Sequence, residues 1–326
     1  MMAEIDFGRI GYGAANVGNL YRALTDDAAW EILQAAWDVG VRYFDTAPHY
    51  GLGLSERRLG AFLATKPRDQ YIVSTKVGRL LRPNPDGVGE LDLANDFAVP
   101  ADLARVWDFS AAGIRQSVEE SLERTGLDRF DVLYLHDPER HSLTEALASA
   151  IPALAGLRDE GLVTAIGVGS MSTDALLASV NTGALDLLMV AGRYTLAEQP
   201  ALAEVVPACR ANGVGIVNAS VFNSGLLATN EPGSSARYDY GDVPAGLLEH
   251  VQAIAAVCRE FAVSLPAAAL QYTLRDDPAG NPVRTVVVGG SRPDHLRQNA
   301  ERMNELIPVE FWHALTERDL IQRSDV

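Results

Sequence analysis

Four ionisable side chains lie at, or just beyond, the ends of three apolar runs in this sequence. Asp45, Lys76 and His136 each end one run, and Tyr50 follows Asp45 within a short loop. A lysine amine near a phenol favours the phenolate, and a carboxylate beside the amine keeps that amine charged. This combination predicts proton transfer at an oxygen atom bonded to carbon, with the pKa of Tyr50 lowered from about 10 toward neutral.

Each of these side chains, taken alone, has an ordinary structural role, such as capping a turn or packing in the core. Only their coincidence at three strand ends favours catalysis. His136 is expected to donate to a substrate oxygen as a neutral imidazole. No metal site is expected, because His136 and Asp45 are the sole candidate ligands and Lys76 opposes a cation. No nucleophile elbow surrounds a serine or cysteine.

The elements that position these side chains are eight short runs rich in β-branched and aromatic residues. Most runs are almost continuously apolar, which is typical of strands covered on both faces. The runs span residues 9–13, 41–45, 71–76, 130–136, 164–168, 185–190, 214–218 and 285–289. Segments with helical spacing separate them, among them residues 27–39, 110–125, 142–159 and 247–261.

This alternation predicts an α/β fold, a parallel (β/α)8 TIM barrel formed by residues 1–326 as a single domain. The ends of all strands would then meet at one mouth. An open doubly wound sheet is the alternative, but no Gly-x-Gly-x-x-Gly opens the helix after the first strand. Ser110 and Ser142 stand where helix N-caps belong. Two long connections, residues 81–109 after the third strand and 228–246 after the seventh, predict binding loops on the rim.

The composition narrows the class of function. Lys and Arg number 27 against 43 Asp and Glu, a formal net charge of −16, so the average surface repels nucleic acid and anionic membranes. No apolar stretch resembles a membrane span, and the first ten residues lack a secretory signal. We expect a cytoplasmic protein, a monomer or weak homo-oligomer, without nucleic-acid or membrane partners. Cys209 and Cys258 are expected to be small buried residues without a chemical role.

Around Asp45, Tyr50, Lys76 and His136 the chain resembles the aldo-keto reductases. The matching motifs are FDTAPHYG (residues 44–51), SERRLG (55–60), STKV (74–77) and LYLH (133–136). Members of this family use an Asp, Tyr, Lys and His tetrad on a (β/α)8 barrel, with a nicotinamide cofactor. The resemblance covers essentially the whole chain and implies that Asp45, Tyr50, Lys76 and His136 form the tetrad. Tyr50 would be the proton donor or acceptor.

The resemblance also implies a cofactor site, although several of its positions depart from the family's motifs. The segment GVGS (residues 167–170) replaces G-V-S-N, Ala191 replaces a glutamine, and Ala219 replaces the tyrosine that stacks on nicotinamide. The implied contacts are Gly13, Ala14, Ala15, Asp45, Ser170, Ser220, Phe222, Ser224, Gly225, Gly289, Gly290, Ser291, Arg292 and Asn299. Gly289 and His295 stand where strongly NADPH-dependent members carry a Lys and an Arg. We therefore expect NAD, with NADP through Arg292 as the alternative.

Further motifs are similar to those of one branch of the family, the L-fucose, D-threo-aldose and L-galactose 1-dehydrogenases. These motifs are PHYGLGLSERRLG, STKVGRLLRP, HDPE and AGRYTLAEQ. The likeness implies oxidation of the anomeric C1 hydroxyl of an aldose to a lactone by hydride transfer. Rim residues expected to contact such a substrate are His49, Trp107, Asp108, His136, Asp137, Arg193 and Tyr194.

Several different functions are compatible with the same residues. A pyridoxal 4-dehydrogenase is a near relative of this branch, and a broad NADPH-dependent aldehyde or ketone reductase would use the same tetrad. A cofactor-binding auxiliary or sensor subunit would keep the barrel without significant turnover. Schiff-base aldolase chemistry at Lys76 is less favoured, because the neighbouring carboxylate opposes a neutral amine.

Overall fold

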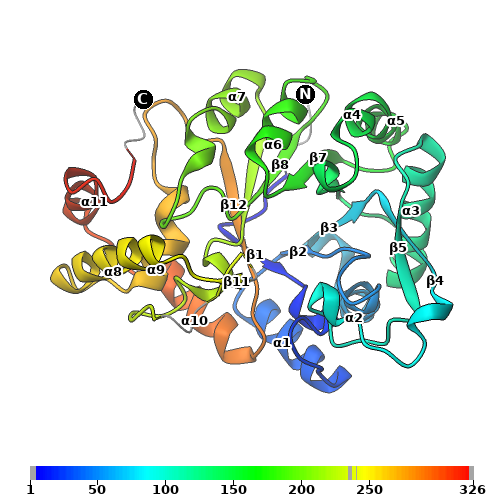
Figure 1. The fold of residues 1–326 in the computed structure, drawn as a ribbon, viewed down its shortest axis with the longest axis horizontal. Coiled ribbons are helices and arrows are strands. Elements are labelled where there is room, and N and C mark those ends of the chain that lie inside the picture. The colour runs from blue at the N-terminus through cyan, green and yellow to red at the C-terminus, as the bar shows by residue number, and fades with distance from the viewer. Residues whose placement is uncertain (1–4, 234–236, 240, 323–326) are drawn as a thin grey trace.

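Eight parallel strands close into a barrel in the computed structural model of this protein, which describes residues 5–233, 237–239 and 241–322 (Figure 1). Their order around the barrel is β1-β12-β9-β8-β7-β6-β3-β2. The strands are β1 Ile10–Gly13, β2 Tyr43–Asp45, β3 Ile72–Val77, β6 Val132–His136, β7 Ala165–Ser170, β8 Leu187–Ala191, β9 Gly215–Ala219 and β12 Val283–Val288. All eight predicted strands are confirmed to within two residues at each end, and closure of the barrel rules out the open-sheet alternative.

Alternate residues of the strands face the barrel interior and the surrounding helices. Tyr43 and Tyr134 pack in an interior cluster, whereas their neighbours Phe44 and Leu133 pack against the helical layer. Because both faces of the strands are covered, the strand sequences are apolar almost throughout, as the sequence predicted. The period of two also directs Asp45, Lys76 and His136 inward, since each lies two residues from an inward-facing position on its strand.

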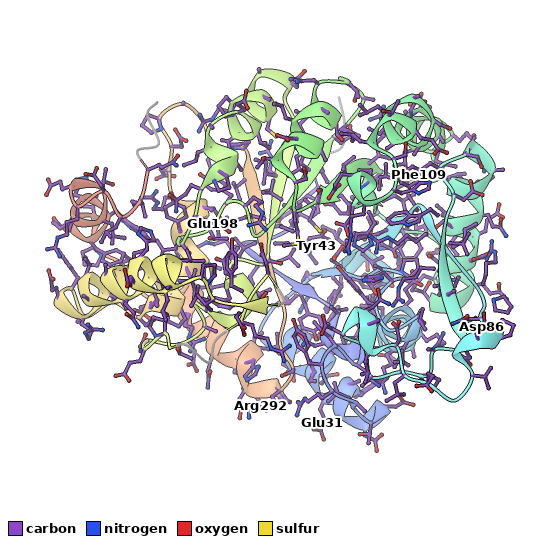
Figure 2. All side chains as sticks on the ribbon, viewed as in Figure 1. Glu31, Tyr43, Asp86, Phe109, Glu198 and Arg292 are labelled. Carbon is purple, nitrogen blue, oxygen red and sulfur yellow. The ribbon has the colours of Figure 1, made fainter. Side chains whose placement is uncertain are left out.

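Glycines on neighbouring strands make room for the two interior tyrosines. A Cβ atom on Gly11 would lie 2.6 Å from the Tyr43 ring, and one on Gly167 would lie 2.8 Å from the Tyr134 ring. Both distances are shorter than normal contacts, so any larger side chain would displace a tyrosine. Figure 2 shows Tyr43 near the centre of the barrel.

The helices form an outer layer around the strands (Figure 1). They are α1 Asp26–Asp38, α2 Leu54–Leu63, α3 Ala111–Thr125, α4 Leu143–Glu145, α5 Ile151–Asp159, α6 Thr173–Val180, α7 Val205–Asn212, α8 Ala245–Glu260, α9 Leu265–Gln271, α10 Pro293–Met303 and α11 Val309–Glu317. The predicted N-caps are confirmed, because Ser110 Oγ accepts from the Gly113 amide and Ser142 Oγ from the Glu145 amide.

The predicted helix over residues 142–159 differs in detail. A π-helical turn, Ala146–Ala150, separates α4 from α5. Pro152 lies at the start of α5 and has no N–H group, which removes one regular helical hydrogen bond at this point. The segment is helical, but not a continuous α-helix.

Both predicted long connections follow the carboxyl ends of barrel strands and so lie on the mouth side. The first contains an antiparallel hairpin of β4 Arg79–Pro83 and β5 Leu103–Trp107. The second contains the short hairpin of β10 Arg237–Tyr238 and β11 Gly241–Asp242, and its residues 234–236 and 240 lie outside the described residues. Residues 1–4 and 323–326 also lie outside the described residues. The single domain predicted for residues 1–326 therefore stays a prediction.

Candidate active site

The four residues of the predicted tetrad lie together at the mouth of the barrel. Lys76 Nζ donates to Asp45 Oδ2 over 2.5 Å, and both side chains are almost completely buried. The same ammonium lies 4.7 Å from the centroid of the Tyr50 ring. The Tyr50 and His136 rings are nearly perpendicular, with centroids 6.0 Å apart. Strands β2, β3 and β6 therefore place a carboxylate, an amine, a phenol and an imidazole around one small volume.

A hydrogen-bonded chain inside the barrel fixes the carboxylate of this tetrad. Ser74 Oγ donates to Asp45 Oδ1 over 2.7 Å, and the hydroxyl of Tyr43 lies 2.9 Å from Ser74 Oγ. Lys76 Nζ also donates to the carbonyl oxygen of Thr46 over 3.0 Å. Both carboxylate oxygens and the ammonium thus have defined partners, which keeps this buried charge pair oriented.

The pKa of Tyr50 differs from the sequence prediction. Burial raises the pKa of Tyr50 above its ordinary value, and the nearby Lys76 ammonium offsets only part of that rise. The expected lowering of the Tyr50 pKa toward neutral is therefore wrong for the protein without a ligand, because desolvation of the phenolate outweighs the attraction of the amine.

Lys76 itself stays charged. Burial lowers the pKa of Lys76, but Asp45 and Tyr50 more than offset this effect, so its pKa lies above the ordinary value. A protonated amine is a poor nucleophile, which argues against Schiff-base chemistry at this position.

Two histidines stand side by side at the mouth, and both are neutral. The His49 and His136 rings have centroids 5.6 Å apart. Burial lowers the pKa of His136 well below its ordinary value, and the charges of Arg79 and Lys76 lower it further. Burial and nearby arginines lower the pKa of His49 to about 2. His136 is therefore a neutral hydrogen-bonding group, as the sequence predicted.

Sequence reasoning missed one residue of this site, Arg79 at the start of β4. Its Nη2 donates to Asp137 Oδ2 over 2.7 Å, and its guanidinium lies 4.3 Å from the Trp107 ring centroid. The side chain is only 6% exposed. The signal in the sequence was a second basic residue, three positions after Lys76, at the same strand end.

The predicted substrate contacts divide into two groups. His49, Trp107 and Asp137 lie around Arg79 and His136, and their contact with a substrate stays a prediction. The other three side chains are engaged elsewhere. Asp108 accepts from the amide and hydroxyl of Ser110 at the start of α3.

The structure contradicts the prediction that Arg193 and Tyr194 contact the substrate. Arg193 donates to Glu198, Asp239, the Tyr238 hydroxyl and a backbone carbonyl, so it joins the β8 loop to the β10–β11 hairpin. Tyr194 is buried in the outer layer, where its ring packs edge-to-face on Tyr272 at 5.9 Å. Both residues follow a strand end, which favoured a substrate contact. The packing of the loops instead directs both side chains to partners within the protein.

The turn after β9 has an unusual backbone conformation. Ser220, Asn223 and Ser224 have left-handed backbone angles, with φ values of 57°, 44° and 56°, and Gly225 follows with φ 107°. Such angles are costly for residues other than glycine and cluster at functional sites, and turns of this kind can direct amides toward an anion. Phe222 is partly exposed within the same turn. Ser220, Ser224 and Gly225 are the residues predicted for the pyrophosphate side of the cofactor, and Phe222 is a further predicted cofactor contact.

The remaining predicted cofactor residues lie at neighbouring strand ends. Gly13 ends β1, Ala14 and Ala15 follow it, and the Ala14 amide donates to the Asp45 carbonyl. The hydroxyl of Ser170 donates to Glu139 over 2.7 Å and accepts from the Ser172 amide, so it is already engaged within the protein.

The loop after β12 carries the predicted adenosine contacts. A Cβ atom on Gly289 would lie 2.7 Å from Asn16 Oδ1, so the two loops approach closely there. Gly290 accepts from the Tyr12 hydroxyl through its carbonyl, and Asn299 is buried within α10.

Two arginines, Arg22 and Arg292, lie beside this loop and are called the basic corner. Arg292 donates to His295, and Arg22, from the connection after β1, donates to the Ser291 carbonyl over 2.6 Å. Figure 2 shows Arg292 at the outer edge beside α10. Arg22 is a cationic residue that sequence reasoning did not place here, because 269 positions separate it from Ser291. The two guanidinium groups of this corner suit the anionic half of a nicotinamide cofactor.

In the described part of the chain, no cluster of three or more His, Cys, Asp or Glu side chains could hold a metal ion. No single described helix has the length and apolarity to cross a membrane; α8 with the segment 265–274 meets those criteria only as a pair bent by 103°.

Comparisons with known proteins agree with this geometry. Residues 9–319 match the model of the Aldo/keto reductase family. A D-threo-aldose 1-dehydrogenase from Pseudomonas sp is 62% identical, covering 96% of this chain and 94% of its own. A pyridoxal 4-dehydrogenase from Microbacterium luteolum is 34% identical, with coverage of 96% and 94%. An L-galactose dehydrogenase from Arabidopsis thaliana is 31% identical, with coverage of 91% and 84%. The resemblance predicted from the motifs is confirmed.

Proposed function

Because this chain belongs to the aldo/keto reductase family and is an oxidoreductase enzyme, we propose that it oxidises the anomeric C1 hydroxyl of an aldose to a lactone. The observation that carries the proposal is the 62% identity to a D-threo-aldose 1-dehydrogenase over nearly the whole chain. The joint position of Asp45, Tyr50, Lys76 and His136 at the mouth supports it, since these groups suit proton transfer at an oxygen.

In this proposal the side chains divide the work of proton transfer. Tyr50, as the phenolate, accepts the proton of the anomeric hydroxyl, and the C1 hydrogen leaves as a hydride, so that C1 and its oxygen form the lactone carbonyl. A nicotinamide cofactor, when bound, supplies the hydride acceptor. Lys76 stabilises the phenolate, Asp45 orients Lys76, and neutral His136 donates to the substrate oxygen and positions it.

The raised pKa of Tyr50 predicts the pH dependence of this reaction. Oxidation requires the phenolate, and with a pKa above 10 the phenolate fraction increases about tenfold per pH unit throughout the neutral range. We expect kcat/KM for sugar oxidation to rise steadily from pH 6 to pH 9.5 without a plateau, measured as reduced nicotinamide formed under subsaturating sugar. A plateau reached by pH 8 would show that the working enzyme has a Tyr50 with a much lower pKa.

The cofactor in this proposal is NAD, with NADP accepted through the basic corner. Arg292 and Arg22 could hold a 2′-phosphate even though Gly289 and His295 replace the usual Lys and Arg. The β9 turn would hold the pyrophosphate, and the ends of β1 and β7 would flank the nicotinamide.

Replacing Arg292 tests this assignment. A lost charge-assisted contact costs about 1.5–3 kcal/mol, so Arg292→Gln should lower kcat/KM for NADP by roughly 10–100-fold. The value for NAD should change far less. Arg297→Gln, on the helix α10 that begins directly after Arg292, is the matched control, because Arg297 pairs with Asp294. Equal losses for the two cofactors would contradict a 2′-phosphate contact.

One assay decides among the functions. Reduced nicotinamide is followed while the purified protein receives L-fucose, D-arabinose, L-galactose, pyridoxal or simple alcohols, with NAD and NADP separately. We expect turnover of at least one sugar. Activity with pyridoxal alone would instead indicate a pyridoxal 4-dehydrogenase. Aldehyde reduction with a clear NADPH preference, measured in the reverse direction with the reduced cofactors, would indicate a broad reductase. Cofactor binding without any turnover would favour an auxiliary or sensor subunit.

A further inference from the structure

A buried ion pair beside His136 has no task in the tetrad mechanism. Arg79 holds Asp137 Oδ2 at 2.7 Å, and the same oxygen lies 3.6 Å from His136 Nε2. The Arg79 side chain is 6% exposed, and that of Asp137 is 17% exposed. The pair connects two segments of the rim, because Arg79 follows β3 and Asp137 follows β6.

This pair is a poor candidate for a purely stabilising contact. Burying a guanidinium and a carboxylate costs so much solvation that an apolar pair of similar size is often as stable. Asp137 is moreover held with φ 42°, a left-handed conformation that costs energy in any residue with a side chain. Arg79 Nε has no hydrogen-bond partner among the described residues. Features of this kind cluster at functional sites.

The geometry of the pair leaves one acceptor available to a substrate. Arg79 occupies Asp137 Oδ2, whereas Oδ1 accepts no hydrogen bond from a described residue, and the side chain is partly exposed. Next to it stands His136, a neutral imidazole that can donate. The mouth thus offers a donor and an acceptor side by side, which matches two oxygens on adjacent carbons: one that accepts and one that donates.

We propose that Arg79 is a positioning residue that holds Asp137 as the acceptor for the hydroxyl on the carbon next to the reacting carbon. This inference rests on the proposed function, in which His136 binds the oxygen of the reacting carbon. A polyhydroxylated substrate donates a hydrogen bond to the Asp137 carboxylate. A substrate without that hydroxyl would desolvate Asp137 without replacing its hydrogen bond to water, and the site discriminates against it.

A matched pair of sugars isolates the hydroxyl in question. D-Arabinose and 2-deoxy-D-ribose differ only by the C2 hydroxyl, so the ratio of their kcat/KM values reports on its recognition. The ratio does not depend on the fraction of correctly folded enzyme, which removes a purely structural effect of a substitution. The assay is run at pH 8, where His136 is neutral and Lys76 is charged; the other charged groups around Asp137 are Asp45, Arg79 and Arg140.

We expect Asp137→Asn and Arg79→Met each to reduce this ratio by about tenfold or more, mainly through a loss with D-arabinose. Arg79→Lys should restore part of the ratio, because a lysine can still pair with the carboxylate. The control is Arg82→Met on the same strand, whose partner Glu120 belongs to α3, and it should leave the ratio unchanged.

Two negative results are distinguishable. If the wild-type enzyme oxidises D-arabinose and the ratio is the same in wild type, Asp137→Asn and Arg79→Met, the inference is overturned while the proposed function stands. If the wild-type enzyme oxidises neither this sugar nor L-fucose or L-galactose with either cofactor, both fail together.

Discussion

Tyr50→Phe should lower kcat for sugar oxidation by about 10²–10⁴-fold while leaving cofactor affinity unchanged. The substitution removes the hydroxyl that exchanges a proton with the substrate, but it keeps the ring that lies over Lys76. The measurements are initial rates under saturating sugar and a fluorescence titration with reduced nicotinamide. Since the change affects only the reacting group, the loss should appear in kcat and kcat/KM alike.

Tyr194→Phe is the control for this prediction. Tyr194 also follows a barrel strand, but its ring is buried against Tyr272 in the outer layer, away from the tetrad. It should keep its activity. A Tyr50→Phe enzyme with nearly normal turnover would remove Tyr50 from the reaction, and a Tyr194→Phe enzyme with a large loss would return Tyr194 to the substrate site.

Asp45→Asn should destabilise the protein by about 3–5 kcal/mol and abolish most of its activity. Asparagine keeps the shape of the side chain but leaves the Lys76 ammonium buried, at 2% exposure, without a counterion. The pKa of Lys76 should then fall, because burial is the strongest influence on it and Asp45 would no longer oppose that influence. The free energy of unfolding is measured by urea denaturation at pH 7.

The double variant Asp45→Asn/Lys76→Met separates stability from catalysis. Removing the ammonium eliminates the unpaired charge, so much of the lost stability should return, whereas activity should not. The comparison pair is Arg318 and Glu260, which form an exposed salt bridge, and Glu260→Gln should change stability only slightly. If Asp45→Asn costs no more than this surface variant, the Lys76 ammonium does not depend on Asp45 for its charge balance.

Much of the fold and of the tetrad was predictable from the sequence because both depend on local patterns. Strands covered on both faces are apolar throughout, and short runs of this kind alternate with helical segments along the whole chain. Once a parallel barrel is inferred, every strand end must lie at one mouth. Asp45, Lys76 and His136 could therefore be brought together without any knowledge of loop conformation.

The rim could not be predicted in this way. Asp137 and Arg193 both follow a strand end, so the sequence predicted a substrate contact at each. In the structure Asp137 lies beside His136, whereas Arg193 is held by Glu198 and its neighbours. Arg22 reaches the loop after β12 from the other end of the sequence. Such contacts depend on how separate loops pack against one another, and no local periodicity records that packing.

Residue patterns along the chain were enough to predict the barrel, the four chemical groups at its mouth and a neutral His136. Three features required the folded protein: which rim residues are available to a ligand, the pairing of Arg79 with Asp137, and the raised rather than lowered pKa of Tyr50. The physical reason is common to all three. Hydrogen-bond partners and desolvation are properties of the folded surroundings of a side chain, whereas strand periodicity and strand ends are properties of the chain itself.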